Sequence, residues 1–511
     1  MTRHVDVLII GAGLSGIGMA CHLTREQTGR SYAILERRTA VGGTWDLFRY
    51  PGIRSDSDML TFGFGFRPWI GTKVLADGPH IRQYIEETAA EYGVTEHIRF
   101  GRTMTKASWS SEAELWTVEA LDEQTGETEI YTSNFLASCT GYYDYDNGYR
   151  PEFPGEADFR GQIVHPQHWP EGLDYHDKRV VVIGSGATAI TLVPAMADDT
   201  AHITMLQRSP TYIATLPADD PVAVGMKYAR MPKKIAYRAG RARNIALQRA
   251  SFRLSRTNPE LSKKLLLAAV RKQVGKQIDM RHFTPSYNPW DQRLCIVPNG
   301  DLFKALRSGK ASIVTDHIDR FTETGIRLAS GEELPADIVI SATGLTIQIL
   351  GGATLEVDGE PVSTREHVVY KGTLLDGIPN AMLVLGYTNA SWTLKADLAA
   401  EYFCRILNHM KAHGYTKVVA IAEDADRSDQ SVMGSALTSG YIQRGDGVMP
   451  RQGTRGPWQV INNYFHDRVL LRKASLEDGV LTFDGVAGAA RPGHKPRGQE
   501  RKQIALAATN P

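Results

Sequence analysis

Two glycine-rich turns carry the first chemical signal in this sequence. The first turn, Gly11-x-Gly13-x-x-Gly16, directly follows an apolar run rich in β-branched residues and opens a stretch with helical periodicity. Its first glycine permits a tight turn, its second lets backbone N–H groups approach a pyrophosphate, and its third lets helix and strand pack closely. The helix start, which includes Ser15, would aim the positive end of its dipole at the phosphates. This spacing predicts a dinucleotide site.

A second turn of the same kind follows the strand expected over residues 179–183. It reads Gly184-x-Gly186-x-x-Ala189, with Ala187 and Thr188 at the expected helix start. Two such turns predict two dinucleotides in one chain, whereas a simple dehydrogenase needs only one.

The residues that end the next strand differ between the two sites. Glu36 ends the first, where a carboxylate can accept hydrogen bonds from ribose hydroxyls. Arg208 and Ser209 stand at the equivalent place in the second, where they would bind the 2′-phosphate that a carboxylate would repel. The first site therefore predicts FAD or NAD and the second predicts NADPH, a combination that favours a flavoprotein.

The bulk composition places these turns in a large globular enzyme. The chain has 511 residues, 42% hydrophobic and 23% charged, with a formal net charge of +1. That length predicts two or three domains, and the balanced charge argues against a nucleic-acid binder. The four cysteines, Cys21, Cys139, Cys295 and Cys404, form no CxxC pair. We therefore expect a reduced, cytoplasmic protein without a disulfide framework, and not a flavin disulfide reductase.

The N-terminus imitates a secretory signal, with a basic start and an apolar run before Cys21. Asp6 interrupts that run, and the glycine spacing already has a role in the dinucleotide turn. We interpret the segment as part of the fold. No apolar run approaches the ~18 residues of a membrane-spanning helix.

The segment 159–172 contains two histidines, His165 and His168, three residues apart. A metal site, a plain linker and a family fingerprint all compete to explain it. A zinc site would need further ligands, and no nearby cysteine or acidic cluster supplies them. We therefore expect no metal.

Two long patterns give this segment a specific meaning. Residues 159–170 fit the fingerprint of type I Baeyer–Villiger monooxygenases, which this chain resembles from residue 1 to about 480. Within that family it resembles the ethionamide-activating branch. The matching positions of this fingerprint are Phe159, Gly161, His165, Trp169 and Pro170. Those of a second family pattern are Gly42, Gly43, Trp45, Tyr50, Pro51, Gly52 and Asp56.

The resemblance implies an activity and roles for these residues. NADPH would reduce FAD, and a C4a-peroxyflavin formed with O₂ would convert ketones to esters and oxygenate sulfides or thioamides. Arg293 matches the active-site arginine that stabilises negative charge, and Asp56 matches its carboxylate partner. Gly43, Thr44 and Trp45, in and within the second pattern, would bind cofactor alongside Asp56. Phe159, Gly161, His165 and Trp169 would couple the domains.

Other activities remain as alternatives. An N- or S-hydroxylating flavin monooxygenase usually carries Tyr or Phe in place of Trp169-Pro170. An NADPH oxidase or reductase would not need Arg293, and a nucleotide-binding regulatory module would not need Asp56 and Arg293 together.

The expected fold class is α/β, with two Rossmann-like dinucleotide-binding domains and an inserted helical subdomain. We expect a split FAD domain at 1–145 and 335–487, an NADPH domain at 146–216 and 291–334, a helical insertion at 217–290 and a flexible tail at 488–511. Thr-Gly turns at 140–141 and 343–344 would carry the chain between the two domains. A helix starting near residues 391–393 would either face the flavin or be merely capped there.

The insertion is strongly basic. Residues 227–276 hold fifteen lysines and arginines against the single acid Glu260, a net charge of +14. Solvated helices on a lid are the simplest interpretation. Contact with anionic lipid at the membrane surface, or self-association with an acidic surface of another copy, is the alternative.

Overall fold

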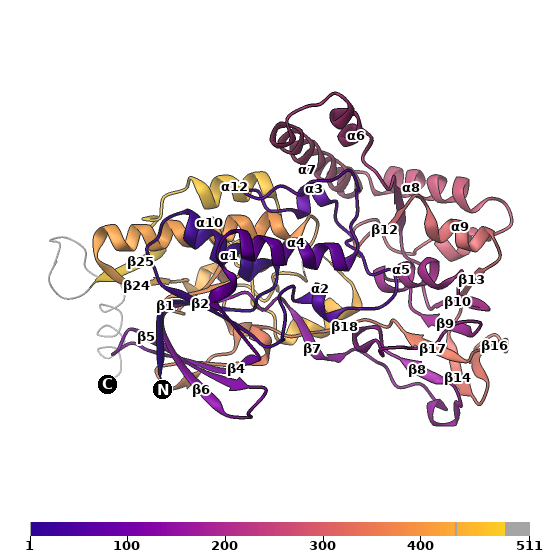
Figure 1. Cartoon of the computed structure of the whole chain (residues 1–511), viewed down its shortest axis with the longest axis horizontal. Coiled ribbons are helices and arrows are strands. Elements are labelled where there is room, and N and C mark those ends of the chain that lie inside the picture. The colour runs from indigo at the N-terminus through magenta and orange to yellow at the C-terminus, as the bar shows by residue number, and fades with distance from the viewer. Residues whose placement is uncertain (1, 435–436, 486–511) are drawn as a thin grey trace, which may run out of the picture.

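A computed structural model describes residues 2–434 and 437–485 of the chain (Figure 1). Two sheets divide the molecule, one on each side of the view, and a helical layer lies above them (Figure 1). This agrees with the expected α/β class. The flexible tail expected for residues 488–511 lies outside the described residues.

The first half of the molecule contains a nine-stranded sheet in which β1 lies between β2 and β6. The sequence of β1 is RHVDVLII, and its last four residues are buried because strands pair with it on both sides. Its parallel part is β3-β2-β1-β6, with β23 also pairing with β6. Beyond β6, β5 and β4 pair antiparallel, β19 pairs parallel to β4, and β20 pairs antiparallel to β19. The strands are β1 (Arg3–Ile10), β2 (Tyr32–Glu36), β3 (Ile98–Phe100), β4 (Arg102–Ser110), β5 (Leu115–Asp122), β6 (Thr128–Ser138), β19 (Thr354–Val357), β20 (Glu360–Pro361) and β23 (Ala381–Leu383).

A five-stranded parallel sheet forms the second half, in the order β13-β10-β9-β17-β8. Its strands are β8 (Gln162–Val164), β9 (Arg179–Ile183), β10 (His202–Gln207), β13 (Ala311–Thr315) and β17 (Ile338–Ser341). The expected return to the FAD domain at residue 335 is wrong, because β17 pairs with both β8 and β9 in this second sheet. The antiparallel strands β14 (Ile318–Thr322), β15 (Gly325–Leu328) and β16 (Glu333–Pro335) precede it.

The chain crosses between the sheets on a short antiparallel ribbon. β7 (Tyr143–Gly148) pairs with β18 (Leu345–Ile347), each directly after one of the Thr-Gly turns. The helical insertion also begins and ends on paired strands, β11 (Ile213–Leu216) and β12 (Cys295–Pro298).

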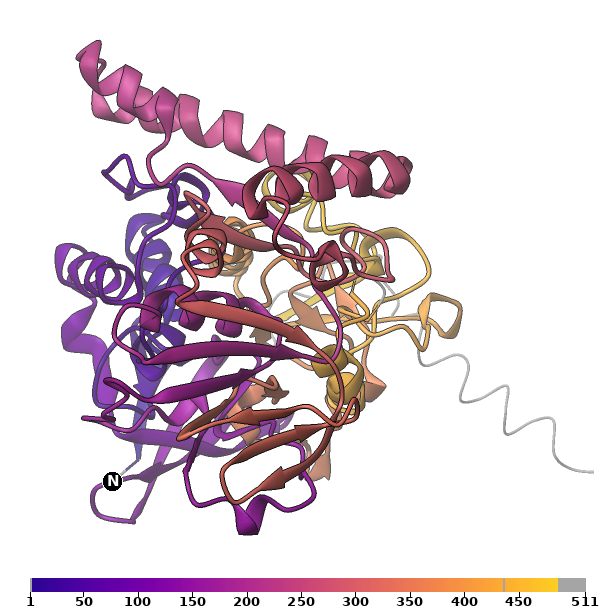
Figure 2. The ribbon, with the colours of Figure 1, turned by 90° about the vertical axis from the view of Figure 1, so that its right-hand side faces the viewer.

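The insertion consists of α6 (Pro221–Tyr228), α7 (Lys233–Thr257) and α8 (Pro259–Val274), which lie along the top edge of the molecule in Figure 2. Capping defines two of their starts, because Asp220 accepts from backbone N–H groups of α6 and Asn258 from one of α8. The expected helical character of this segment is confirmed.

Helices cover the first sheet and the dinucleotide turns. They are α1 (Leu14–Arg25), α2 (Thr44–Leu47), α3 (Met59–Phe62), α4 (Gly78–Glu91), α10 (Trp392–His413), α11 (Gly440–Arg444) and α12 (Tyr464–Arg472), with α5 (Ala187–Met196) and α9 (Asp301–Arg307) on the second sheet. The short pairs β21 (Val369–Tyr370) with β22 (Leu374–Leu375), and β24 (Tyr415–Ala420) with β25 (Leu481–Gly485), complete the fold. Among the helices of residues 2–434 and 437–485, each is too short or too polar to cross a bilayer.

Candidate functional site

In the first glycine-rich turn, Gly11 and Gly16 cannot be replaced by larger residues, because neighbouring backbone atoms occupy the space. Gly11 has φ +99°, and a methyl group there would lie 2.8 Å from the carbonyl oxygen of Cys139. A methyl group on Gly16 would lie only 1.8 Å from the Gly11 carbonyl oxygen, so α1 packs directly on the turn. Both glycines are therefore required by the backbone approach predicted for a dinucleotide turn.

The second turn repeats this construction. Gly184 has φ +140°, and a methyl group there would lie 2.4 Å from the Ala342 carbonyl oxygen. The space beside Gly186 is open, with no heavy atom within 4 Å of such a methyl group. Cys139 and Ala342 each directly precede a Thr-Gly turn. Each segment that carries the chain between the two sheets therefore begins in contact with one of the glycine-rich turns.

Glu36 lies at the carboxyl end of β2 and is buried. Its carboxylate accepts hydrogen bonds from the backbone N–H groups of Ala12 (2.7 Å) and Arg38 (2.8 Å). Burial raises the pKa of Glu36 above its ordinary value, and these two hydrogen bonds oppose that shift. A carboxylate offers about four lone-pair positions, so capacity remains for ribose hydroxyls.

One large cavity connects the two turns. It is lined by Gly11, Gly13, Ser15 and Glu36 of the first site and by Ala187 and Thr188 of the second, together with Gly43, Thr44, Trp45, Asp56 and Arg293. Of the remaining predicted cofactor residues, Gly16 packs beneath the turn, while Gly184, Gly186, Arg208 and Ser209 lie outside this lining.

Asp56 and Arg293 meet in this cavity although 237 positions separate them in the chain. The Nε atom of Arg293 lies 3.4 Å from Oδ2 of Asp56, and each side chain is about one-third exposed, at 32% and 37%. The negative charge of Asp56 raises the pKa of Arg293 above its ordinary value, against the effect of burial. Arg293 is therefore a permanent cation on the cavity wall.

Aromatic residues surround this pair, and the sequence interpretation assigned them no role. Tyr142 and Tyr143 share a hydroxyl–hydroxyl hydrogen bond of 3.0 Å, and Tyr142 stacks on Trp392 at 5.3 Å. Trp392 in turn donates from Nε1 to the Ser15 hydroxyl at 2.8 Å, which joins α10 to α1. The two tyrosines directly after the Thr140-Gly141 turn were a sequence signal that could have predicted this aromatic cluster.

The other members of the second pattern line the same wall. Gly43 has φ +56°, and a methyl group there would lie 3.2 Å from both the Gly13 Cα atom and the Tyr145 hydroxyl. The Thr44 hydroxyl lies 3.4 Å from the Tyr145 hydroxyl, and Trp45 packs edge-on against Phe62. The loop of residues 42–45 thus closes over the first turn.

The fingerprint of residues 159–170 lies against the crossing ribbon and outside the cavity lining. The His165 Nε2 donates to the Gly344 carbonyl oxygen at 3.3 Å, while Nδ1 accepts from the Gln167 backbone N–H. Its ring covers Gly148, where a methyl group would lie 2.1 Å away. Burial lowers the pKa of His165, in agreement with the neutral form that these two hydrogen bonds require.

The remaining fingerprint residues stabilise the neighbouring segment. A methyl group on Gly161 would lie 2.4 Å from both the Asp337 carbonyl oxygen and the Phe159 ring. Phe159 packs on Phe321 at 5.8 Å, and Trp169 packs on Tyr175 at 6.5 Å.

Arg208 and Ser209 are exposed just beyond the end of β10. Within residues 2–434 and 437–485, the Arg208 guanidinium forms no ion pair or side-chain hydrogen bond. It is thus free to bind an external anion.

The N-terminus of α10 lies beside Tyr387 and Trp392, which line the cavity. The hydroxyls of Thr388, Ser391 and Thr393 are buried and have no partner within the described part of the chain. Such groups are normally satisfied, so a bound molecule with donors and acceptors fits this place. Together with the glycine cradle, they fit a flavin dinucleotide.

Comparison with known families decides the identity. The model of the flavin-binding monooxygenase-like family matches residues 74–411, and an NAD(P)-binding Rossmann-like model matches residues 9–87. The chain belongs to the flavin-binding monooxygenase-like family. Its curated relatives over nearly the whole chain are FAD-containing monooxygenases, so it is a flavin-dependent monooxygenase.

Curated relatives of this monooxygenase span nearly its whole length. It is 56% identical over 492 residues to the putative FAD-containing monooxygenase MymA of Mycobacterium tuberculosis, covering 95% of this chain and 99% of that protein. It is 51% identical to FAD-containing monooxygenase EthA of the same species, covering 94% and 98%. These matches confirm the expected flavin monooxygenase and its FAD cofactor.

A solved structure shows the same fold. An oxidised steroid monooxygenase bound to NADP matches with a TM-score of 0.76 and 22% identity, covering 94% of the monooxygenase described here and 100% of that chain. This confirms the two Rossmann-like halves.

Proposed function

We propose that this monooxygenase converts ketones to esters and also oxygenates sulfides. The balanced reaction consumes ketone, O₂, NADPH and a proton, and yields ester, water and NADP⁺. The observation that carries the proposal is the Arg293–Asp56 pair on the wall of a cavity that reaches both dinucleotide turns. A solved structure with this fold is described as cyclohexanone-bound cyclohexanone monooxygenase, which supports a ketone as the substrate class.

Bound FAD would accept a hydride from NADPH and activate O₂ for transfer. Gly11, Gly13, Ser15 and Glu36 would hold its pyrophosphate and ribose, with the 43–45 loop closing over them. Asp56 would orient Arg293, whose guanidinium would stabilise the negative charge that develops on the carbonyl oxygen during oxygen insertion. Within the described residues, Arg293 has one ion pair, so donors remain for substrate.

The domain roles are part of the same proposal. Residues 1–145 and the segment after β18 would bind FAD, and the five-stranded sheet with residues 146–216 would bind NADPH. His165 would set the angle between them through its contacts with Gly148 and Gly344, because both lie on the crossing ribbon.

Product analysis tests the activity. Purified protein with bound FAD would receive NADPH, ¹⁸O₂ and either linear, cyclic and aromatic ketones or aryl sulfides. We expect one ¹⁸O atom per ester and near-stoichiometric NADPH use. Hydrogen peroxide equal to NADPH, with no product, would instead favour the oxidase, and sulfoxide without ester would favour the N- or S-hydroxylating alternative.

Replacing Arg208 by alanine should weaken NADPH binding. A charge-assisted hydrogen bond contributes about 1.5–3 kcal/mol, so KM for NADPH should rise about 10- to 100-fold while KM for NADH stays constant. Steady-state kinetics with both cofactors measures this change. Arg307→Ala, at an exposed arginine on α9, is the control. Equal changes for both cofactors would show that Arg208 does not bind the 2′-phosphate.

For the basic insertion we propose docking on an anionic lipid surface. Its helices leave large apolar side chains exposed, at Val222, Tyr228, Met231, Ile235, Leu247, Leu261 and Leu265. Of its fifteen basic residues, three form ion pairs with acids of the described chain: Arg241, Arg243 and Arg256. Unpaired cations interleaved with exposed apolar groups fit the headgroup boundary of an anionic membrane.

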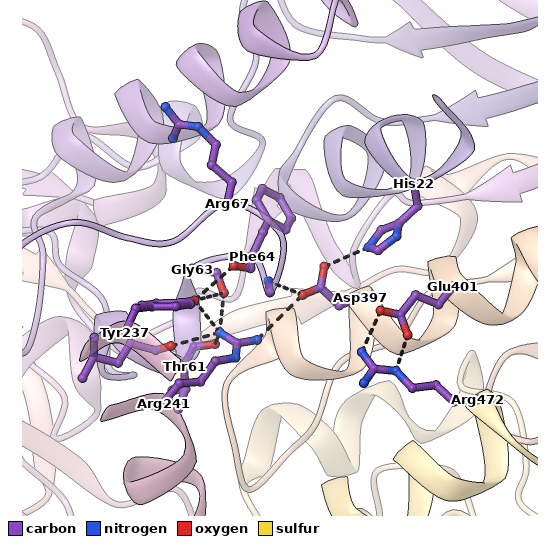
Figure 3. Close-up of polar contacts among 12 residues, drawn as sticks. His22, Thr61, Gly63, Phe64, Arg67, Tyr237, Arg241, Asp397, Glu401 and Arg472 are labelled. Atoms are coloured by element: carbon purple, nitrogen blue, oxygen red, sulfur yellow. Dashed lines mark hydrogen bonds and ion pairs between the residues drawn. The ribbon is translucent and has the colours of Figure 1, made fainter. Parts of the chain in front are cut away.

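The inner side of the insertion is fixed to the first domain, which leaves the opposite side free. Arg241 and Tyr237 are buried and point into residues 60–64, while Asp397 approaches from α10 (Figure 3). A methyl group on Gly240 would lie 2.8 Å from Leu60, so α7 packs closely here.

Sedimentation with phosphatidylserine vesicles tests this surface. We expect binding at low salt that weakens at physiological salt, and at least tenfold weaker binding when Lys234, Arg238 and Arg253 are changed together to Glu. The same reversal at Lys178, Arg365 and Lys473 is the control. No binding at either salt would refute lipid docking. Dimerisation in solution that the first variant abolishes would instead favour self-association.

A further inference from the structure

A cluster of two histidines and a glutamate lies at the far end of α10, away from the cavity. His409 and His413 occupy the last turn of α10, one helical turn apart, and their ring centroids are 4.3 Å apart. Glu477 approaches from the turn between α12 and β25, with Oε1 3.7 Å from His409 Nε2. One ligand atom from each residue lies within 4.8 Å of the other two.

From this cluster we infer a binding site for a zinc-class divalent metal ion. Two imidazole nitrogens and one carboxylate oxygen form a ligand set that zinc accepts, with water in the fourth position. Tetrahedral ligands at about 2.0–2.2 Å from zinc lie about 3.4 Å apart, so a small closure is needed. Glu477 and His413 can supply it because both side chains are exposed.

One of the two histidines already has the hydrogen bond that orients a metal ligand, and the other has a buried ring nitrogen without a partner in the described chain. His413 Nδ1 donates to the His409 carbonyl oxygen at 2.8 Å, which leaves Nε2 free and sets the ring orientation. His409 Nε2 is buried and has no hydrogen-bond partner within the described chain. A bound cation would satisfy it.

The surroundings of the cluster also favour a bound cation. The α10 C-terminus, capped by Gly414, places partial negative charge beside the site. Phe483 lies 4.8 Å from the His409 ring and covers one side.

The metal would join the end of α10 to the turn before β25. The sequence interpretation missed this site because it sought ligands near His165 and His168, whereas Glu477 lies 64 positions after His413. The inference does not depend on the proposed substrate.

Isothermal titration of the chelator-treated, FAD-loaded enzyme with zinc chloride tests the site. We expect one site per chain, loss of that site in His413→Ala, and at least tenfold weaker binding in Glu477→Gln. His176→Ala removes an exposed histidine beside Asp177 and is the control. No binding, or equal binding in wild type and His413→Ala, would overturn the inference.

Thermal unfolding gives a second readout, since a ligand that binds only the folded state raises the unfolding midpoint. Zinc should raise the midpoint of the wild type and the His176→Ala control, but not that of His413→Ala. The exposed positions of His413 and Glu477 make the variants themselves well tolerated. An equal zinc effect in all variants would show that the ion acts elsewhere.

Discussion

Replacing Arg293 by alanine should abolish ester formation while NADPH consumption continues. The guanidinium is the fixed positive charge that Asp56 holds at 3.4 Å on the cavity wall. Loss of one preorganised donor of this kind costs about 10²–10³ in kcat. The reducing equivalents should then appear as hydrogen peroxide. Ester yield, NADPH loss and peroxide, measured together, give the coupling ratio.

Two further variants sharpen this result. Arg293→Lys keeps a charge but not the planar set of donors, so it should recover only part of the activity. Arg281→Ala removes an exposed arginine in the same stretch of chain and should leave coupling unchanged. Ester formation near the wild-type rate in Arg293→Ala, with normal FAD content, would contradict the proposed role.

Replacing Arg241 by methionine should cause the largest loss of stability. Arg241 Nη1 donates to the carbonyl oxygens of Leu60 (2.9 Å) and Gly63 (2.6 Å), and Nη2 lies 3.7 Å from Asp397 (Figure 3). These groups are buried, with the Arg241 side chain 11% exposed and that of Asp397 7% exposed. Removing one partner of a buried ion pair costs about 3–5 kcal/mol, because the remaining charge stays buried.

Urea and thermal unfolding midpoints measure this loss. Arg238→Met, less than one turn earlier on α7 and exposed, is the matched control and should change the midpoint little. Asp397 also accepts from His22 Nε2 (3.2 Å) and Gly65 N (2.7 Å), so Asp397→Asn should destabilise as well. The double variant should lose less than the sum of the two. Equal midpoints for Arg241→Met and Arg238→Met would refute the buried-anchor interpretation.

Local patterns allowed the sequence to predict the two dinucleotide turns, the helical insertion and the start of α10. Each depends on residues close together in the chain, such as Gly11 and Gly16, whose packing follows from backbone sterics. The boundary at residue 335 failed because the buried strand Ile338–Ser341 has the same apolar pattern whichever parallel sheet it joins.

Local patterns could not predict contacts between residues that lie far apart in the chain. The pairing of Asp56 with Arg293 was anticipated only through the family resemblance, since nothing in spacing relates them. Arg241 looked like one more cation of a basic helix, and only the packing of α7 on residues 60–64 shows that it is internal. The hydrogen bond between Trp392 and Ser15 was equally beyond prediction, because 377 positions separate the two residues in the chain.

The position of the Arg241 anchor sets a rule for exchanging parts between relatives. Arg241 and Tyr237 bind carbonyl groups of residues 60–64, in α3 and directly after it, a few positions beyond Asp56. A chimera that receives residues 217–290 from another enzyme would therefore lose the contacts that fix the segment after Asp56. Such a graft should keep a tyrosine and an arginine four residues apart at the junction, whatever else it changes, or reshape the donor helix and residues 54–66 as a single unit.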